Sequence, residues 1–230
     1  MTDELRGPAP NPEWQRGSKI HSPVDQMVSL DLRTMASTPI YKLLIGAIVP
    51  RPIAFISTVS PEGKGNLAPF SFFNGVSSDP PCIMVAITRK PDGGKKDTLR
   101  NIEATRQFVV NSVSEWMAEP MNYCSADFPY EVDEMEQVGL TPIPSLTVKP
   151  PRVKESPIHL ECELYNTMEV GDGRPGSSTI VVGRIVTMHI HERAYDNGRI
   201  RIEELRPLSR LAGFSYGKTS GIFDIPRPKL

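Results

Sequence analysis

The stretch IAFISTVSPEGKGNLAPFSFFN (residues 53–74) carries the strongest fold signal in the chain. Its first part, residues 53–59, is rich in β-branched and aromatic side chains, which favour a strand. Residues 60–65 have the composition of a turn, and residues 66–74 are predicted to return as a second strand. The stretch therefore predicts a β-hairpin.

Similar short strands follow along the chain. They are predicted at residues 82–88, 108–113, 158–165 and 180–192. One helix is expected to begin with Asp97 or Thr98 as its N-cap, and Ser114 is expected to cap a second. Asp196-Asn197-Gly198 predicts a hairpin turn. Six or more strands with two or three helices favour an antiparallel barrel or sandwich over a βαβ sheet.

The two ends of the chain differ from this middle part. Residues 1–38 form a proline-broken extension in which Trp14 is the large apolar side chain expected to gain from docking. Partial disorder and packing across a partner subunit remain the two alternatives for it. Residues 39–217 are predicted to form one domain, with an insertion of loops and helical turns at 121–151, and residues 218–230 form a C-terminal tail.

Composition excludes several classes of protein. The chain has 26 basic and 27 acidic residues, so its net charge of −1 argues against nucleic-acid binding through bulk positive charge. No apolar run reaches the roughly 18 residues of a membrane span, and the first residues do not resemble a signal peptide. Cys82, Cys124 and Cys162 form no C-x-x-C pair. They are expected to be buried, reduced thiols of a cytoplasmic protein.

The predicted strand at residues 66–74 is unusual for a plain core strand. Alternation places Ala68, Phe70, Phe72 and Asn74 on one face. Pro69 removes a backbone donor, which indicates an edge or a bulge. Such an irregular edge exposes main-chain groups that can hydrogen-bond a planar heterocycle. The alternative is a barrel strand with aromatic filling.

A second candidate site surrounds the first predicted helix. Arg89, Lys95 and Lys96 precede Asp97 and Thr98 at the expected helix start. Cations next to a helix N-terminus form an anion site, and one phosphate is the expected ligand. The alternative is a solvated basic loop.

Two further groups carry weaker signals. His189 and His191 could form a metal pair, but no carboxylate at matching spacing completes it, and solvated or partly buried imidazoles are the alternative. The segment from Pro207 onward, called the tail below, contains Arg210, Tyr216 and several glycines, and it could cover a site or pack on a partner subunit. The chain contains no Walker A or H-E-x-x-H motif. GDGRPG (171–176) has the spacing G-x-G-x-x-G, but it runs into the strand predicted at 180–192 and opens no helix, so it does not indicate a Rossmann site. GFSYG (213–217) has the spacing G-x-S-x-G, but it lies in the C-terminal segment without the strand-to-helix turn of a hydrolase.

Together these motifs resemble the flavin reductase-like, FMN-binding split-barrel family. The resemblance runs from about Tyr41 to Gly217 and rests on RPIA (51–54), NLAPFSFFN (66–74), SDPP (78–81), KDTLRNI (96–102) and the segment 207–216. It implies a mainly β fold, a six-stranded antiparallel Greek-key split barrel with a few peripheral helices. It also implies a homodimer with FMN near the subunit interface.

The resemblance further implies which residues hold FMN. The isoalloxazine and ribityl chain are assigned to residues of two strands: Arg51, Pro52, Ser57, Thr58, Ala68, Pro69, Phe70, Ser71, Phe72, Phe73 and Asn74. The phosphate is assigned to Arg89, Lys96, Asp97 and Thr98, and Arg210 is expected to contact flavin or nicotinamide. No side chain is expected to act as an acid or base, because the flavin itself supplies the chemistry.

The implied activity is hydride transfer from NAD(P)H to flavin, with a monooxygenase or another acceptor taking the electrons. Two alternatives stay open. The long extension and the insertion could mark an FMN-binding electron carrier that is fed by a protein partner. A barrel that binds haem through His189 or His191 is the other.

Overall fold

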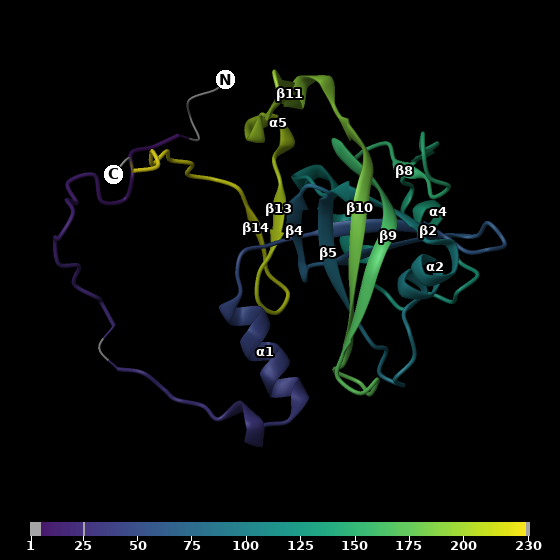
Figure 1. Cartoon of the computed structure of the whole chain (residues 1–230), viewed down its shortest axis with the longest axis horizontal. Helices are drawn as coiled ribbons and strands as arrows, with labels where there is room; N and C mark the ends of the chain where they lie inside the picture. Colours follow the sequence, from purple (N-terminus) through teal and green to yellow (C-terminus); the bar gives the residue numbers. More distant parts are fainter. Residues whose placement is uncertain (1–5, 25, 229–230) are drawn as a thin grey trace.

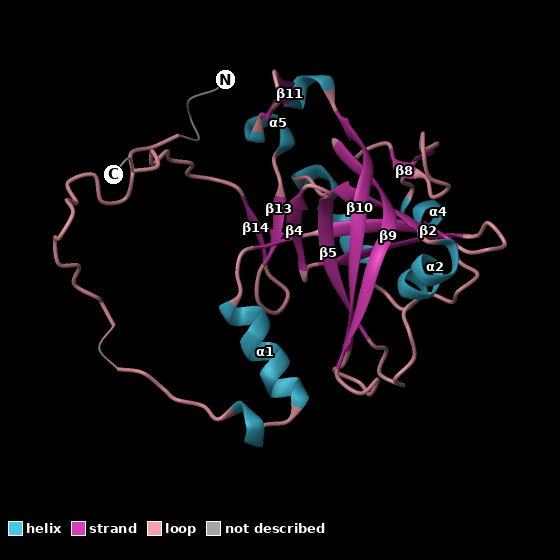
Figure 2. Ribbon diagram, in the orientation of Figure 1, coloured by secondary structure: helices cyan, strands magenta, loops and turns pink. Residues whose placement is uncertain are grey.

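The computed structural model describes residues 6–24 and 26–228, and its centre is a seven-stranded antiparallel sheet (Figures 1 and 2). The strand order is β3-β2-β6-β9-β10-β5-β4. These strands are β2 (Ala54–Val59), β3 (Gly65–Phe70), β4 (Phe73–Ser78), β5 (Pro81–Thr88), β6 (Gln107–Ser112), β9 (Ile158–Val170) and β10 (Ser178–Ile190). The mainly β class predicted from the sequence is confirmed.

The sheet closes through a very short connection. β3 and β4 lie at opposite edges of the sheet but are joined by two residues, Ser71 and Phe72. The two edges must therefore meet, and the sheet curls into a barrel. The prediction of one strand over residues 66–74 is wrong at this point, because the chain breaks at Ser71 and crosses to the other edge. Because the predicted strand is divided into β3 and β4, the main sheet has seven strands. The expected count of six is not confirmed.

Pro69 fits this topology. It lies in β3, opposite Phe55 of β2, and β3 has β2 as its sheet neighbour at this edge. Proline is tolerated in an edge strand because its missing N–H removes no ladder bond on the paired side. The edge position predicted from Pro69 is therefore correct.

Two apolar clusters stabilise the fold. The barrel interior is filled by side chains from several strands and from α2 (Asp97–Thr105), with Phe108, Ile56 and Leu99 among the most buried. Gly183 lies against Phe108 so closely that an added Cβ would overlap the ring. A second cluster, which includes Phe55 and the methionines of the insertion, lies on the other side of β2.

Short elements surround the barrel. The other helices are α1 (Ser37–Ala47), α3 (Ala118–Tyr123), α4 (Glu134–Val138) and α5 (Ile202–Leu205), with 3-10 turns η1 (Leu32–Thr34), η2 (Glu115–Met117) and η3 (Glu192–Ala194). β1 (Arg51–Pro52), β13 (Leu208–Arg210) and β14 (Tyr216–Lys218) form a three-stranded sheet. The remaining pairs are β7 (Pro142–Ile143) with β8 (Arg152–Val153), and β11 (Tyr195–Asp196) with β12 (Arg199–Ile200).

Local predictions had mixed outcomes. The turn at Asn197 and Gly198 joins β11 to β12, with both residues at positive φ, as a type I′ hairpin requires. The predicted N-cap of the first helix is wrong: α2 starts at Asp97 after Lys96, without a side-chain cap. Ser114 is the N-cap residue of the 3-10 turn at Glu115–Met117, as predicted, but its hydroxyl donates to Leu205 O at 2.6 Å and makes no capping hydrogen bond.

The chain ends lie outside this compact part. Residues 6–36 arch away from the barrel (Figure 1), and α1 crosses the expected boundary at residue 38. Residues 1–5 and 25 of the predicted extension, and 229–230 of the tail, lie outside the described residues. Among the described residues, no helix is long and apolar enough to cross a membrane. The three cysteines are buried and free, as predicted.

Candidate functional site

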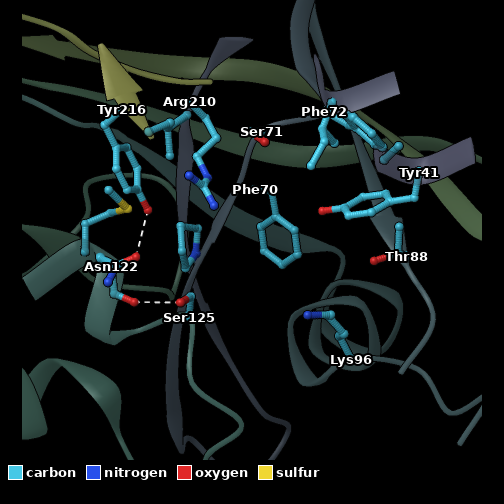
Figure 3. A pocket seen from close by; sticks show the side chains of 15 residues that line it. Tyr41, Phe70, Ser71, Phe72, Thr88, Lys96, Asn122, Ser125, Arg210 and Tyr216 are labelled. Atoms are coloured by element: carbon cyan, nitrogen blue, oxygen red, sulfur yellow. Dashed lines mark hydrogen bonds between the residues drawn. The ribbon is translucent and has the colours of Figure 1, made fainter. Parts of the chain in front are cut away.

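A groove runs past the break between β3 and β4 (Figure 3). It consists of two adjoining cavities of about 230 and 300 Å³, which share four lining residues: Pro69, Phe70, Lys96 and Ser125. Because the cavities share this wall, one elongated ligand can occupy both. The irregular strand singled out in the sequence forms the floor of the groove.

The first cavity is aromatic. Phe70 and Phe72 flank Ser71 at the strand break, and Tyr41 of α1 meets Phe72 edge-on with ring centroids 6.5 Å apart. Tyr216 of β14 forms the opposite wall. Aromatic walls and exposed main chain at a strand break suit a flat heterocycle, since rings stack or meet edge-to-face at low cost.

Arg51 lies behind this cavity and is almost fully buried, with 4% of its surface exposed. Its guanidinium donates to the carbonyls of Ile45 (2.7 Å), Ile48 (2.6 Å) and Leu211 (3.0 Å), and to Ser71 Oγ (3.3 Å). Burial lowers the pKa of Arg51 from its usual value. The residue thus ties the end of α1, the tail and the strand break together from the inside.

The tail and the insertion form one rim of the groove. The Arg210 guanidinium lies 4.5 Å from the centroid of the Tyr216 ring. The Tyr216 hydroxyl donates to Asn122 Oδ1 at 2.8 Å, and Ser125 Oγ donates to the Asn122 carbonyl at 2.6 Å (Figure 3). The tail therefore contacts the insertion directly at this rim.

The second cavity is polar and lies at the N-terminus of α2. Lys90 pairs with Asp97 at 3.1 Å. Lys96 lines both cavities and makes no ion pair within the described part of the chain. Thr98 is buried, and its hydroxyl accepts from Asn66 Nδ2 at 2.9 Å, so its own proton remains available. A cation and a helix N-terminus together favour an anion here.

Two titratable groups at this end have shifted pKa values. Burial raises the pKa of Glu134, whose carboxylate accepts from Leu67 N at 2.8 Å. Burial also raises the pKa of the Cys124 thiol to about 12. Cys124 therefore stays protonated at neutral pH, which does not suit a nucleophile.

The structure brings only part of the predicted residue set into the groove. The residues that line it are Ala68, Pro69, Phe70, Ser71, Phe72, Lys96, Asp97, Thr98 and Arg210. Arg51 lies behind it, and Pro52 and Phe73 line a separate apolar cavity of about 360 Å³.

The other predicted residues point elsewhere. Ser57 Oγ donates to Pro151 O, and Thr58 Oγ1 accepts from Asn66 and Asn101. Asn74 Oδ1 accepts from the backbone of Gly75, and Arg89 pairs with Glu169 at 2.8 Å. Lys95, the remaining member of the basic segment, pairs with Glu103 at 2.6 Å.

Several lining residues were not predicted from the sequence. Tyr41 and Ile45 come from α1, and Met121, Asn122 and Ser125 come from the insertion. Nothing local in their sequence marks them, because they reach the groove through contacts between segments far apart in the chain.

The two histidines have separate surroundings. His189 Nε2 lies 2.7 Å from Glu161 Oε1, and His191 follows β10 as the N-cap residue of η3. Burial acts to raise the pKa of Glu161, but hydrogen bonds from Thr147, Leu146 and His189 lower it to about 2. Within the described ranges, no three metal-ligating side chains cluster.

Residues 46–206 match the sequence model of the flavin reductase like domain. The chain belongs to this family, and the resemblance seen in its motifs is confirmed.

Solved structures agree with this assignment. Nitrilotriacetate monooxygenase component B from Bacillus cereus is 39% identical, covers 88% of this chain and all of its own, and superposes with a TM-score of 0.84. The 2-nitrobenzoate 2-nitroreductase of Pseudomonas fluorescens is 34% identical over 87% of this chain and 96% of its own, with a TM-score of 0.79. An uncharacterised protein of Halalkalibacterium halodurans is 44% identical over 191 residues, 83% of this chain and 91% of its own.

Proposed function

We propose that this chain is an FMN-binding oxidoreductase of the flavin reductase type, which transfers hydride from NAD(P)H to flavin. The observation that carries the proposal is the single groove that is aromatic at one end and cationic at the other. A flavin mononucleotide has the same division, with a flat ring system at one end and a phosphate at the other.

The chemistry of the groove residues also fits this ligand, beginning with the phosphate end. Lys96 is a cation without an ion-pair partner in the described structure, and it lies beside the N-terminus of α2 with the Thr98 hydroxyl. We assign the phosphate to these groups, with Asp97 holding Lys90 in place. Lys90 also lines this cavity and adds positive charge there.

The aromatic cavity would position the ring. Phe70, Ser71 and Phe72 supply main-chain groups and apolar walls at the strand break, and Ala68 and Pro69 continue the wall toward the phosphate end. When bound, the flavin supplies the hydride-accepting chemistry, and the protein supplies orientation, exclusion of water and charge. Arg210 at the rim is the cation assigned to the nicotinamide or the flavin edge.

The remaining predicted residues act indirectly in this proposal. Arg51 holds Ser71, α1 and the tail in position. Pro52 of β1, Ser57 and Thr58 of β2, and Phe73 and Asn74 of β4 shape the strands beside the groove, and Arg89 orders the end of β9 through Glu169. In this proposal none of these seven residues needs to touch the ligand.

The proposed assembly is a homodimer that passes electrons to a monooxygenase or another acceptor in the cytoplasm. The likeness to component B of a Bacillus cereus monooxygenase supports the acceptor. Three buried, free thiols support a reducing compartment.

One observation favours the carrier as a second candidate. The insertion and the tail are joined at the rim of the aromatic cavity by the hydrogen bond between Tyr216 and Asn122, and both residues line that cavity. A nicotinamide needs room beside the flavin ring, whereas electron transfer from a protein partner does not.

FMN titration of the purified protein tests the site. We expect Lys96→Ala to weaken FMN binding about ten-fold or more, because a charge-assisted contact is lost. Lys95→Ala is the matched control, since Lys95 is the adjacent lysine but pairs with Glu103. Equal affinities of the two variants would refute the phosphate assignment.

The visible spectrum after anaerobic addition of NADH or NADPH then separates the two candidates. Rapid bleaching of the bound flavin supports the reductase. A flavin spectrum that persists supports the carrier. Failure of the wild-type chain to bind FMN at all would refute both.

A further inference from the structure

Residues 8–34, here called the arm, leave the barrel and make little contact with it. Every described residue of the arm except Ala9 is exposed. Its internal backbone hydrogen bonds are local, such as Trp14 N to Asn11 O and Ser18 N to Gln15 O. The family match begins at residue 46, so the arm lies outside the shared domain.

The arm is nevertheless held at both ends. At its start, Arg6 pairs with Asp224 at 2.7 Å and with Glu203 at 3.5 Å, and Gly7 N donates to Ile222 O at 2.8 Å. At its other end it passes through η1 into α1. The result is an arch that leaves the domain beside the C-terminal tail and returns to it at α1 (Figure 1).

The arch carries apolar side chains that a solvated linker would not need. Seven of them are exposed: Trp14, Ile20, Val24, Met27, Val28, Leu30 and Leu32. Met27 and Val28 are the most exposed of these, at 89% and 86%. Solvated segments are typically poor in such residues, and contiguous exposed apolar surface marks an interaction site.

The total surface supports the same conclusion. The accessible surface is 15134 Å², whereas a compact monomer of 25.5 kDa is expected to expose about 10,400 Å². The excess of about 4,700 Å² exceeds the roughly 800 Å² that each partner contributes to a standard interface. The extended arm and tail therefore leave enough surface exposed for an interface of standard size or larger.

The side of the barrel next to the arch is also apolar. α1 exposes Tyr41 and Leu44, the residue after it, Ile48, is also exposed, and the loop between β13 and β14 exposes Phe214 almost completely. Figure 1 shows α1 and this loop flanking the space that the arch spans. A two-fold dimer presents the same patch from both subunits, so one chain offers both the arm and the surface that the arm needs.

We propose that the arm of each chain wraps around a second copy of this chain and packs its apolar side chains against the α1 face of that copy. The inference rests on the homodimer of the proposed function, and it adds the segment that holds the dimer together. Residues in the arm, not only in the barrel, then determine how tightly two chains associate.

The test uses the full chain with Met27→Glu and Val28→Glu combined. Both side chains are free in the single chain, so the variant should fold normally. Each substitution counts twice in a symmetric dimer, and we expect the dissociation constant of the dimer, measured by sedimentation equilibrium, to rise by about 100-fold or more. Leu146→Gln, at a side chain 75% exposed on the loop after β7, is the matched control and should leave the constant unchanged.

Trypsin provides a second measurement. Arg16, Lys19 and Arg33 are exposed in the single chain and should be protected in the wild-type dimer but cut quickly in the double variant. A wild-type chain that is monomeric at all concentrations would overturn both the homodimer and the wrapping arm. A dimer with an unchanged dissociation constant in the double variant, or with an arm cut as fast as in the monomer, would overturn the arm alone.

Discussion

Replacing Arg51 with Met should destabilise the chain more than most surface or rim substitutions. The side chain is 4% exposed and donates to three carbonyls and one hydroxyl, which belong to α1, the tail and Ser71. Met preserves much of the apolar stem but donates no hydrogen bond. The substitution therefore leaves the Ile45 and Leu211 carbonyls without their donor.

The magnitude follows from these contacts. A hydrogen bond to a charged group contributes about 1.5–3 kcal/mol, and a buried acceptor left unpaired costs about 1–3 kcal/mol. Water can reach some of the freed carbonyls, because the outer face of α1 is exposed, so the contributions do not add fully. We expect the free energy of unfolding to fall by about 3–4 kcal/mol.

Urea unfolding, followed by circular dichroism at fixed protein concentration, measures this loss. Arg51→Lys should give an intermediate value, because one ammonium cannot reach all the acceptors that the guanidinium spans. Arg193→Met, at a side chain 70% exposed, is the control and should leave the unfolding free energy unchanged. A loss below about 1 kcal/mol for Arg51→Met would refute the conclusion that Arg51 holds α1, the tail and Ser71 together.

Other predictions concern the groove and the buried carboxylate. Lys96→Ala combined with Thr98→Ala should weaken FMN binding more than Lys96→Ala alone, as measured by quenching of flavin fluorescence. If the double variant binds FMN as tightly as Lys96→Ala, Thr98 does not share the phosphate site. Ser71→Ala should lower the amount of flavin retained through gel filtration, and an equally yellow protein would count against it. Tyr216→Phe removes the hydrogen bond to the insertion and should speed flavin reduction by NADH if that contact restricts access; an unchanged rate would argue against a gate. Glu161 has a pKa of about 2 in the folded chain against 4.5 in the unfolded chain, so its charge stabilises the fold above pH 4.5 and this contribution is lost as pH falls from 4.5 to 2. Glu161→Gln should accordingly cost about 3 kcal/mol at pH 7 and flatten the acid limb of a stability–pH curve.

The sequence predicted the strands well because alternation and β-branched content are local properties. The hairpin at residues 53–74 shows the limit of that reasoning. Its first half is correct, but the break at Ser71 depends on the barrel closing, and closure involves strands far away in the chain. Ser114 shows the same limit, because its N-cap position before η2 is correct but its hydroxyl bonds to the distant Leu205 carbonyl and not to the turn that it precedes.

The sequence predicted some of the residues that line the groove but not others. Phe70, Ser71 and Lys96 stand in motifs whose composition is itself unusual, and all three line the groove. Other parts of its wall come from Tyr41 and Asn122, which carry no local signal and reach the groove through tertiary packing alone. Ser57 and Thr58 show the converse limit, because their place in a motif does not indicate which face of the strand they occupy, and neither lines the groove.

The two-residue link between β3 and β4 has a consequence for how this chain can vary. Insertion or deletion of one residue at Ser71 would shift the register of a barrel edge and displace the groove floor at the same time. The turn between β9 and β10, at residues 171–177, carries three glycines at positive φ and joins strands that are already paired along their length. Insertions and deletions are therefore tolerable at that turn. At the link between β3 and β4, a change in chain length would alter the binding groove and disrupt the barrel together.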